Sequence, residues 1–142
     1  MSARTSMTPS EFYAFAAEHV PLIASLGLTV EAVGDGEVSV RAPYRAEFGR
    51  PGGTVSGPVM MAAADFAMYA AVISRIGLES MAVTTSLNMN FLSRPPPADV
   101  IATARLLKLG TRLAVGEVSV YSIDGDTLVA HATCTYSIPP RR

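Results

Sequence analysis

Hydrophobic residues recur at helical spacing near the beginning of the chain. A capping box starts at Thr8 and closes at Glu11, the arrangement in which two side chains bond the free N–H groups of a helix start. Phe12 and Ala16 follow four residues apart, as they would on one face of a helix. The pattern predicts a short amphipathic helix that ends near Pro21.

Two runs of alternating apolar and polar residues come next, at residues 28–33 and 37–42, on either side of the turn Gly34-Asp35-Gly36. Alternation places every second side chain on the same face of a strand, and glycines permit a tight turn. The pattern predicts a β-hairpin. Residues 43–53 are rich in glycine, proline and charged residues, which is typical of a loop.

Residues 57–76 have the pattern of a long helix that is apolar on every side. Ser56 suits the N-cap, Pro58 falls in the first turn and Gly77 stands where the helix would end. A helix without a polar stripe has to be covered by other elements. Its apolar run is about 15 residues long, against the roughly 20 that a membrane span needs, so we expect a core helix.

Four more strands are predicted after this helix, at residues 82–92, 100–108, 113–121 and 127–138. The last two connections are short enough for hairpins. A curved antiparallel sheet wrapped around one helix buries that helix on nearly every side. The expected fold is therefore α+β: a sheet of five to six strands around one long central helix, plus a short N-terminal helix, in a single domain of residues 1–142.

The composition fits such a domain and indicates that it self-associates. The chain has 142 residues, of which 49% are hydrophobic and 16% charged, more apolar than one small globule needs. Its 11 basic and 12 acidic residues form no long run of one sign. Nucleic acid and membrane surfaces are therefore disfavoured as partners.

The few cysteine and histidine residues restrict the chemistry. Cys134 is the single cysteine, so no internal disulfide can form, and the N-terminal residues lack the apolar core of a secretory signal. We therefore expect a cytoplasmic protein. One cysteine and two histidines make a poor ligand set, so no metal and no cofactor is expected. His19, on the apolar face of the first helix, and His131 are more typical of structural imidazoles.

Asp65 is a lone carboxylate within the apolar central helix. Burying an ionised carboxylate is costly unless it is paired or hydrogen-bonded. Arg75, ten residues later, lies about 15 Å along the helix axis and cannot pair with it. Two interpretations stay open. Asp65 faces solvent or accepts hydrogen bonds from strand hydroxyls such as that of Thr84, or it is held in a cleft for base or nucleophilic chemistry.

The start of the same helix offers a second chemical resource. The N–H of Gly57 lies at the positive end of the helix dipole, where it can stabilise a developing oxyanion. Gly57 and Asp65 are eight residues apart, about 12 Å along a helix, so one carbonyl group cannot touch both. If the two cooperate, a second copy of the chain has to supply one of them, which predicts a composite site at a two-fold dimer interface.

With these features the chain resembles the hotdog-fold acyl-CoA thioesterases of the PaaI-like (phenylacetate-pathway) branch of the 4-hydroxybenzoyl-CoA thioesterase superfamily. That branch typically has a His-Gly-Gly turn, an Asp nine residues after the His in a small-residue helix, a Thr-rich strand ending in Phe-Leu-x-Pro, and a K-x-G-x-R hairpin. The corresponding segments here read SGP, AAADFA, TTSLNMNFLSRP and KLGTR. The order and spacing of the motifs carry the resemblance, which implies a hotdog fold.

The resemblance also implies roles for individual residues. Asp65 matches the acid that activates water or attacks the thioester carbonyl. Gly57 matches the residue whose backbone N–H polarises that carbonyl, and Thr84 matches a hydroxyl near the acid that helps to orient water. Basic contacts to the phosphates of coenzyme A are expected from Arg94, Lys108 and Arg112.

Three positions depart from the family pattern. Ser56 stands where the family usually has His, Pro58 replaces the second Gly, and Arg50 stands near where an upstream Asn often orients the substrate or water. Pro58 removes one N–H but leaves that of Gly57. Ser56 can cap the helix and donate a neutral hydrogen bond, but it cannot carry the charge of an imidazole.

These observations predict an enzyme that hydrolyses an acyl-CoA thioester, working as a homodimer or as a tetramer built from two dimers. Two alternatives stay open. The chain is a non-catalytic hotdog module that binds acyl-CoA or another small ligand, as the altered helper residues suggest. Alternatively it is a hotdog hydratase or dehydratase, although that chemistry usually pairs the acid with a His that the turn lacks.

Overall fold

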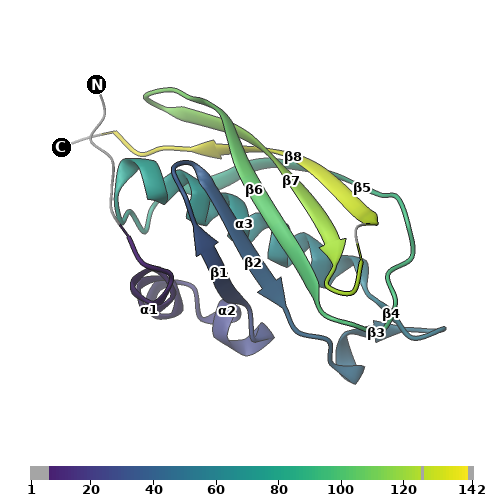
Figure 1. The fold of residues 1–142 in the computed structure, drawn as a ribbon. Helices are drawn as coiled ribbons and strands as arrows, with labels where there is room; N and C mark the ends of the chain where they lie inside the picture. Colours follow the sequence, from purple (N-terminus) through teal and green to yellow (C-terminus); the bar gives the residue numbers. More distant parts are fainter. Residues whose placement is uncertain (1–6, 126, 141–142) are drawn as a thin grey trace.

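The fold, in a computed structural model that describes residues 7–125 and 127–140, is a curved sheet with one long helix against its inner face (Figure 1). The long helix α3 spans Gly57–Ile76. Two shorter helices precede it, α1 at Pro9–His19 and α2 at Pro21–Leu26, together with a 3₁₀ turn, η1, at Ala46–Phe48.

Six antiparallel strands form the main sheet, in the order β1-β2-β6-β7-β8-β5. Their bounds are Thr29–Val33 for β1, Glu37–Ala42 for β2, Val83–Phe91 for β5, Val100–Leu109 for β6, Leu113–Ser122 for β7 and Leu128–Ser137 for β8. A separate small hairpin pairs β3, Gly49–Arg50, with β4, Thr54–Val55.

The predicted α+β architecture is confirmed, since the structure has a six-stranded antiparallel sheet, the central helix and the N-terminal helix. The hydrophobic pattern did not reveal α2, η1 or the β3–β4 hairpin. Each of these elements is too short to show a period. The only signal for α2 is Pro21, which occupies the first turn of that helix just after α1 has ended.

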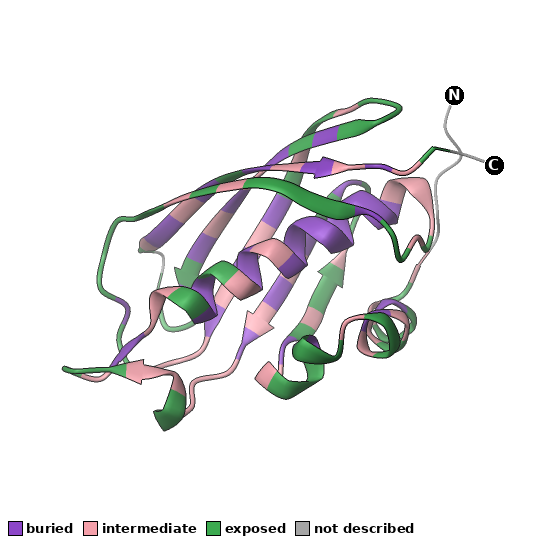
Figure 2. Ribbon diagram, turned by 180° about the vertical axis from the view of Figure 1, so that it is seen from behind, coloured by how far each residue is buried: buried purple, intermediate pink, exposed green. Residues whose placement is uncertain are grey.

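The core lies between α3 and the inner face of the sheet. Most residues of α3 are buried, and alternate residues of β2, β6, β7 and β8 are buried against it (Figure 2). Gly116 on β7 lets the helix approach closely, because a Cβ there would lie 2.6 Å from Sδ of Met68 and 2.8 Å from the carbonyl oxygen of Arg105. Small residues on the strands thus set how near the helix lies to the sheet.

Among the described residues, α3 is the one helix long and apolar enough to cross a membrane by length and composition. However, 72% of its apolar window is buried inside the fold. Such burial is what the core helix of a globular domain requires. The expectation of a core helix is therefore confirmed.

The structure can be compared with the predicted caps of two helices and with the predicted position of His19. The capping box at Thr8 and Glu11 is present as expected. Ser56 does occupy the N-cap of α3, but its side chain makes no capping hydrogen bond, so that part of the prediction was wrong. The reason is local: a cap hydroxyl bonds the second or third N–H of the helix, and Pro58 removes the former. His19 is exposed, with its ring 4.5 Å from that of Phe15, rather than on the buried face of α1.

Strand β5 is at one edge of the main sheet and is poorly covered. Every residue from Val83 to Phe91 is exposed or only partly buried. Large apolar side chains are exposed on and beside it: Met81 is 66% exposed, Val83 54%, Phe91 50% and Leu92 55%. An uncovered, apolar edge strand is a surface on which another strand can pair.

Candidate active site

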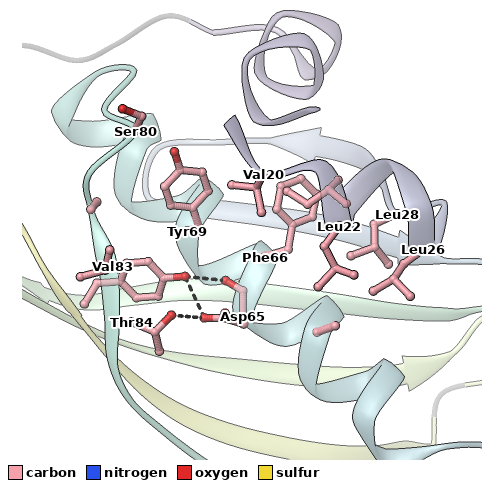
Figure 3. Close-up of a pocket in the computed structure, with 14 residues that line it drawn as sticks. Val20, Leu22, Leu26, Leu28, Asp65, Phe66, Tyr69, Ser80, Val83 and Thr84 are labelled. Carbon is pink, nitrogen blue, oxygen red and sulfur yellow. Dashed lines mark hydrogen bonds between the residues drawn. The ribbon is translucent and has the colours of Figure 1, made fainter. Parts of the chain in front are cut away.

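Asp65 lies midway along α3, where its carboxylate meets the side chains of two strands. The hydroxyl of Thr84, near the start of β5, donates a hydrogen bond to Oδ1 of Asp65 at 2.6 Å (Figure 3). The hydroxyl of Tyr136, on β8, donates to the same oxygen at 2.7 Å. Both partners come from adjacent strands, because Thr84 pairs with Tyr136 across the β5–β8 ladder. The carboxylate is therefore hydrogen-bonded, as the first interpretation of Asp65 required.

The two oxygens of the Asp65 carboxylate differ in their hydrogen bonds. Oδ1 accepts two hydrogen bonds, whereas Oδ2 accepts none from the described residues. Hydrogen bonds to an ionised group are stronger than those between neutral groups, so they fix the position of Oδ1 firmly. Asp65 thus presents one anchored oxygen and one that is free for chemistry.

A pocket opens beside this carboxylate and has a volume of about 390 Å³. It lies between α2, α3 and the beginning of β5 (Figure 3). Its walls are formed by Val20, Leu22, Ile23, Leu26, Leu28, Ala62, Asp65, Phe66, Tyr69, Ser80, Ala82, Val83, Thr84 and Tyr136. A largely apolar cavity with a few convergent polar groups is the usual form of a small-molecule site.

The pocket has a negative group and no described basic side chain among its lining residues. The remaining polar groups on its wall are hydroxyls, and that of Tyr69 donates to the carbonyl oxygen of Glu79 at 3.0 Å. Burial, and secondly the charge of Glu79, raise the pKa of Tyr69 to about 12. The wall near Asp65 is therefore suited to an uncharged, apolar group.

The thiol of Cys134 is not a competing nucleophile at this site. Cys134 is buried on β8, two residues before Tyr136. Burial, and secondly the charge of Asp65, raise its pKa to about 12. Because the thiolate is the reactive form of cysteine, the side chain is inert at neutral pH.

Gly57 lies at the start of α3 and is not one of the pocket residues. Its N–H belongs to the first helical turn, where N–H groups have no acceptor within the helix. The ring of Phe91, the last residue of β5, lies beside it: a Cβ on Gly57 would be 3.2 Å from Cζ of Phe91. Strand β5 therefore touches both candidate groups, Asp65 through Thr84 near one end and Gly57 through Phe91 at the other.

The candidate basic residues lie at two ends of the sheet. Arg94 lies over the β3–β4 turn, with Nη1 3.6 Å from where a Cβ on Gly52 would be, and Arg50 is exposed on β3 of that hairpin. Lys108 and Arg112 lie at the β6–β7 hairpin, at the opposite end of the sheet (Figure 1). Nε of Arg112 donates to the carbonyl oxygen of Ile138 at 3.0 Å.

The structure thus brings together only part of the predicted site. Asp65 and Thr84 meet at the pocket, whereas Ser56, Gly57 and Pro58 lie together at the start of α3. Prediction from the sequence missed Tyr136 and the wall formed by α2. The signal for Tyr136 was its place in the alternating pattern of the last strand, which shows that it points inward but not what it meets. In the described part of the chain, no group of three or more His, Cys, Asp or Glu residues is placed to hold a metal ion.

Comparison with known proteins places this chain in a family. The family model described as "Thioesterase superfamily" matches residues 52–129, more than half of the chain. The chain belongs to the thioesterase superfamily. The match covers α3, with Gly57 and Asp65, and strands β5 to β7.

Individual relatives agree with this assignment. A protein from a Silicibacter species, provisionally named a thioesterase, is 39% identical, with a TM-score of 0.85 over 94% of this chain and 93% of its own. A variant of the phenylacetic acid degradation protein PaaI from Thermus thermophilus is 32% identical, with a TM-score of 0.73 over 82% and 97%. A Halobacterium salinarum protein provisionally named an esterase is 33% identical over 79% of this chain and 76% of its own.

The prediction of a hotdog thioesterase of the PaaI type is confirmed at the level of family and fold. Membership of this superfamily supports an enzyme that hydrolyses acyl thioesters in general.

Proposed function

We propose that this thioesterase hydrolyses acyl-CoA thioesters to the free acid and coenzyme A, with Asp65 as the catalytic carboxylate. One observation carries the proposal: a carboxylate within the core helix opens onto an apolar pocket, with Oδ1 anchored and Oδ2 accepting no hydrogen bond from the described part of the chain. Asp65 is partly buried in an apolar helix, and partial withdrawal of a carboxylate from water has a cost that a catalytic role explains. The pocket offers a place for the acyl group directly beside it.

The chemistry has two forms that both use the free oxygen of Asp65. As a base, Asp65 takes a proton from water while the water oxygen attacks the thioester carbonyl carbon. The tetrahedral intermediate then expels the thiolate of coenzyme A, which regains the proton. As a nucleophile, Asp65 attacks the carbonyl carbon itself, the C–S bond breaks and the thiolate of coenzyme A leaves. Water then cleaves the resulting mixed anhydride, which restores the Asp65 carboxylate and releases the acid, and a proton from this water goes to the thiolate. In both forms the carbonyl oxygen becomes an oxyanion that requires a donor.

We infer that the partner subunit's Gly57 supplies this donor. Asp65 and Gly57 of one chain are about 12 Å apart along α3, too far for one carbonyl. A two-fold axis near the middle of β5, close to Leu87 or Asn88, would pair two copies of this strand antiparallel. The Thr84 end of one strand would then lie beside the Phe91 end of the other, and each Asp65 would face the other chain's helix start.

The exposed character of β5 supports this arrangement. Its free edge can accept a second strand, and its exposed apolar side chains would be covered by the pairing. A symmetric pairing of like surfaces closes as a dimer. Two such dimers can associate further as a tetramer.

The same arrangement would gather the basic residues around the thioester. The Thr84 end of β5 is also the end of the sheet that carries the β6–β7 hairpin, because Val83 and Leu113 both pair with Ser137. Antiparallel pairing would bring the Arg94 end of the partner to this place. We propose that the phosphates of coenzyme A are bound there, by Lys108 and Arg112 of one subunit and by Arg50 and Arg94 of the other.

The experiment is a thiol-release assay with the full chain and a panel of acyl-CoA substrates. Asp65→Asn should reduce kcat/KM by about a hundredfold or more, because the amide cannot take up a proton as the carboxylate does. Uncharged apolar acyl groups should be hydrolysed faster than acyl groups that end in a carboxylate, since the pocket carries Asp65 and no described basic residue. Unchanged turnover in Asp65→Asn would overturn the proposal.

A non-catalytic acyl-CoA binding module is the second candidate, and the start of α3 favours it. Ser56 and Pro58 offer neither an imidazole nor a second glycine N–H there. This candidate predicts saturable binding of acyl-CoA by calorimetry with no free thiol released by the unaltered chain over hours. Thiol release that is lost in Asp65→Asn would exclude it.

A further inference from the structure

Tyr136 differs from the other donor to Asp65 in how firmly it is held. Only 3% of its surface is exposed, whereas Thr84 lies exposed on the edge strand. Its backbone is in β8, which pairs with β7 on one side and β5 on the other. Its ring packs against that of Tyr69, with centroids 6.2 Å apart. The phenol is therefore a rigid donor, placed from the sheet onto the helix.

The hydroxyl of Tyr136 has two acceptors within reach, both on Asp65. Oδ1 lies at 2.7 Å and the backbone carbonyl oxygen at 3.1 Å. One hydroxyl proton can make one good hydrogen bond, and the shorter, charge-assisted contact with the carboxylate is the stronger. The backbone carbonyl nearby restricts where the hydroxyl can lie and so defines its direction.

Burial, and secondly the charge of Asp65, raise the pKa of Tyr136 far above its usual range. The phenol therefore keeps its proton at neutral pH. A phenol that keeps its proton can donate it to the ionised carboxylate of Asp65. A donor of this kind favours the ionised carboxylate over the protonated one.

We propose that Tyr136 is a positioning residue, which holds Asp65 oriented through Oδ1 so that Oδ2 is the oxygen that reacts. The inference rests on the proposed function, since Oδ2 reacts only if Asp65 is catalytic. Tyr136 itself touches no reacting atom in this scheme. It acts through Asp65, in the way that a second group orients a catalytic base.

The test is Tyr136→Phe, which keeps the buried ring and removes only the hydroxyl. Losing a hydrogen bond to a charged group should lower kcat by about tenfold or more while KM changes little. The ionised carboxylate is also less stabilised, so the acid limb of the pH–rate profile should move to higher pH. A merely structural tyrosine would change Tm without moving this limb.

Tyr121→Phe is the matched control. It removes a hydroxyl from a partly exposed tyrosine on β7 that is no part of the pocket or the proposed dimer strand. The control should leave kcat, KM and the acid limb as in the unaltered chain. If Tyr136→Phe behaved like Tyr121→Phe while Asp65→Asn was inactive, Asp65 would be catalytic without help from Tyr136, and the inference would be overturned.

A second measurement does not depend on turnover. The pH at which the Asp65 carboxylate takes up its proton can be followed from its side-chain ¹³C signal in labelled protein, assigned with Asp65→Asn. The midpoint should lie at higher pH in Tyr136→Phe than in Tyr121→Phe. Equal midpoints would overturn the role of Tyr136, whereas absence of thiol release from the unaltered chain would overturn the proposed function instead.

Discussion

The ring of Phe91 lies against the α-carbon of Gly57, so that a Cβ at that position would come within 3.2 Å of the ring. This contact joins the start of the core helix to the last residue of the edge strand. The N–H of the proposed oxyanion donor is therefore held in place by the strand that we expect at the dimer interface. The two parts of the proposed site depend on one another.

Gly57→Ala should weaken both stability and catalysis. The added methyl group must displace the Phe91 ring, and such overpacking should lower the free energy of unfolding by about 1 kcal/mol or more. Urea unfolding measures the stability, and thiol release should fall with it because the helix start moves. Gly125→Ala is the control, since the nearest described atom apart from its chain neighbours, N of Thr127, lies 4.0 Å from the position of its Cβ.

Phe91→Leu should make the same alanine easier to accommodate. The smaller side chain leaves room for the methyl group, so the double variant should lose less stability than the two single losses summed. Additive losses would show that Gly57 and Phe91 are not in steric contact.

Asn88→Lys should destabilise the proposed dimer. Asn88 is exposed near the middle of β5, where a two-fold axis would bring the two copies of the residue close together. Like charges that face each other across paired strands repel, and lysine on an edge strand discourages pairing. Light scattering coupled to size exclusion should show a shift toward monomer, and the loss of thiol release should follow the loss of dimer.

Thr133→Lys is the control for this shift. Thr133 is exposed on β8 directly opposite Asn88, one strand further from the free edge. It should keep the mass of the unaltered protein. A dimer that persisted in Asn88→Lys and dissociated in Thr133→Lys would place the interface on the sheet face rather than on the edge.

Asp99 should stabilise the fold in a pH-dependent way. Its carboxylate accepts the backbone N–H of Tyr44 at 2.7 Å and Nε of Arg41 at 2.7 Å. The Tyr44 hydrogen bond above all, followed by the Arg41 guanidinium, lowers the pKa of Asp99, although burial opposes the shift. A lowered pKa in the folded state adds stability that is complete above the unfolded value and is lost as the pH falls through the folded value.

Asp99→Asn should therefore unfold at lower urea concentration than the unaltered chain at pH 7, and the difference should shrink as the pH falls from about 5 to about 3. Unfolding curves at several pH values measure it. Asp124→Asn changes an exposed aspartate in the β7–β8 connection and serves as the control. A difference that did not vary with pH would show that the ionisation of Asp99 does not contribute.

The hydrophobic patterns predicted most of the fold, because the spacing of apolar residues within one segment reflects whether that segment is a helix or a strand. The core helix occupies residues 57–76 as its apolar pattern and flanking glycines predicted, and the alternating runs became strands within a residue or two. The short elements were not predicted. A six-residue helix such as α2, or a hairpin of two-residue strands such as β3–β4, is too short for its apolar residues to show a repeat. The capping hydrogen bond expected of Ser56 is absent for a different reason, because Pro58 removes one of the two N–H groups that a cap hydroxyl bonds.

The sequence predicted those residues of the candidate site that lie on a single element or that the family resemblance indicates. Asp65 stood out because a charge within an apolar helix requires an explanation, and Gly57 because a helix start carries free N–H groups. Tyr136 could not be found in this way, since its partner Asp65 is 71 residues away and the pairing depends on strand register and helix rotation. The pocket wall depended likewise on where α2 packs.

The sequence by itself determined the fold class, the family, and the helix on which the acid lies. Hydrophobic periodicity and motif spacing can both be read along the chain without knowledge of how its segments pack. Only the tertiary structure decided that two hydroxyls share Oδ1 of Asp65, that an apolar pocket without a described basic residue adjoins it, and that Phe91 covers Gly57. These relationships arise where the helix packs on the curved sheet. Their geometry depends on how side chains from different elements fit together, as Met68 on the helix fits against Gly116 on the sheet. The hydrophobic pattern of a single segment carries no information about such contacts between segments.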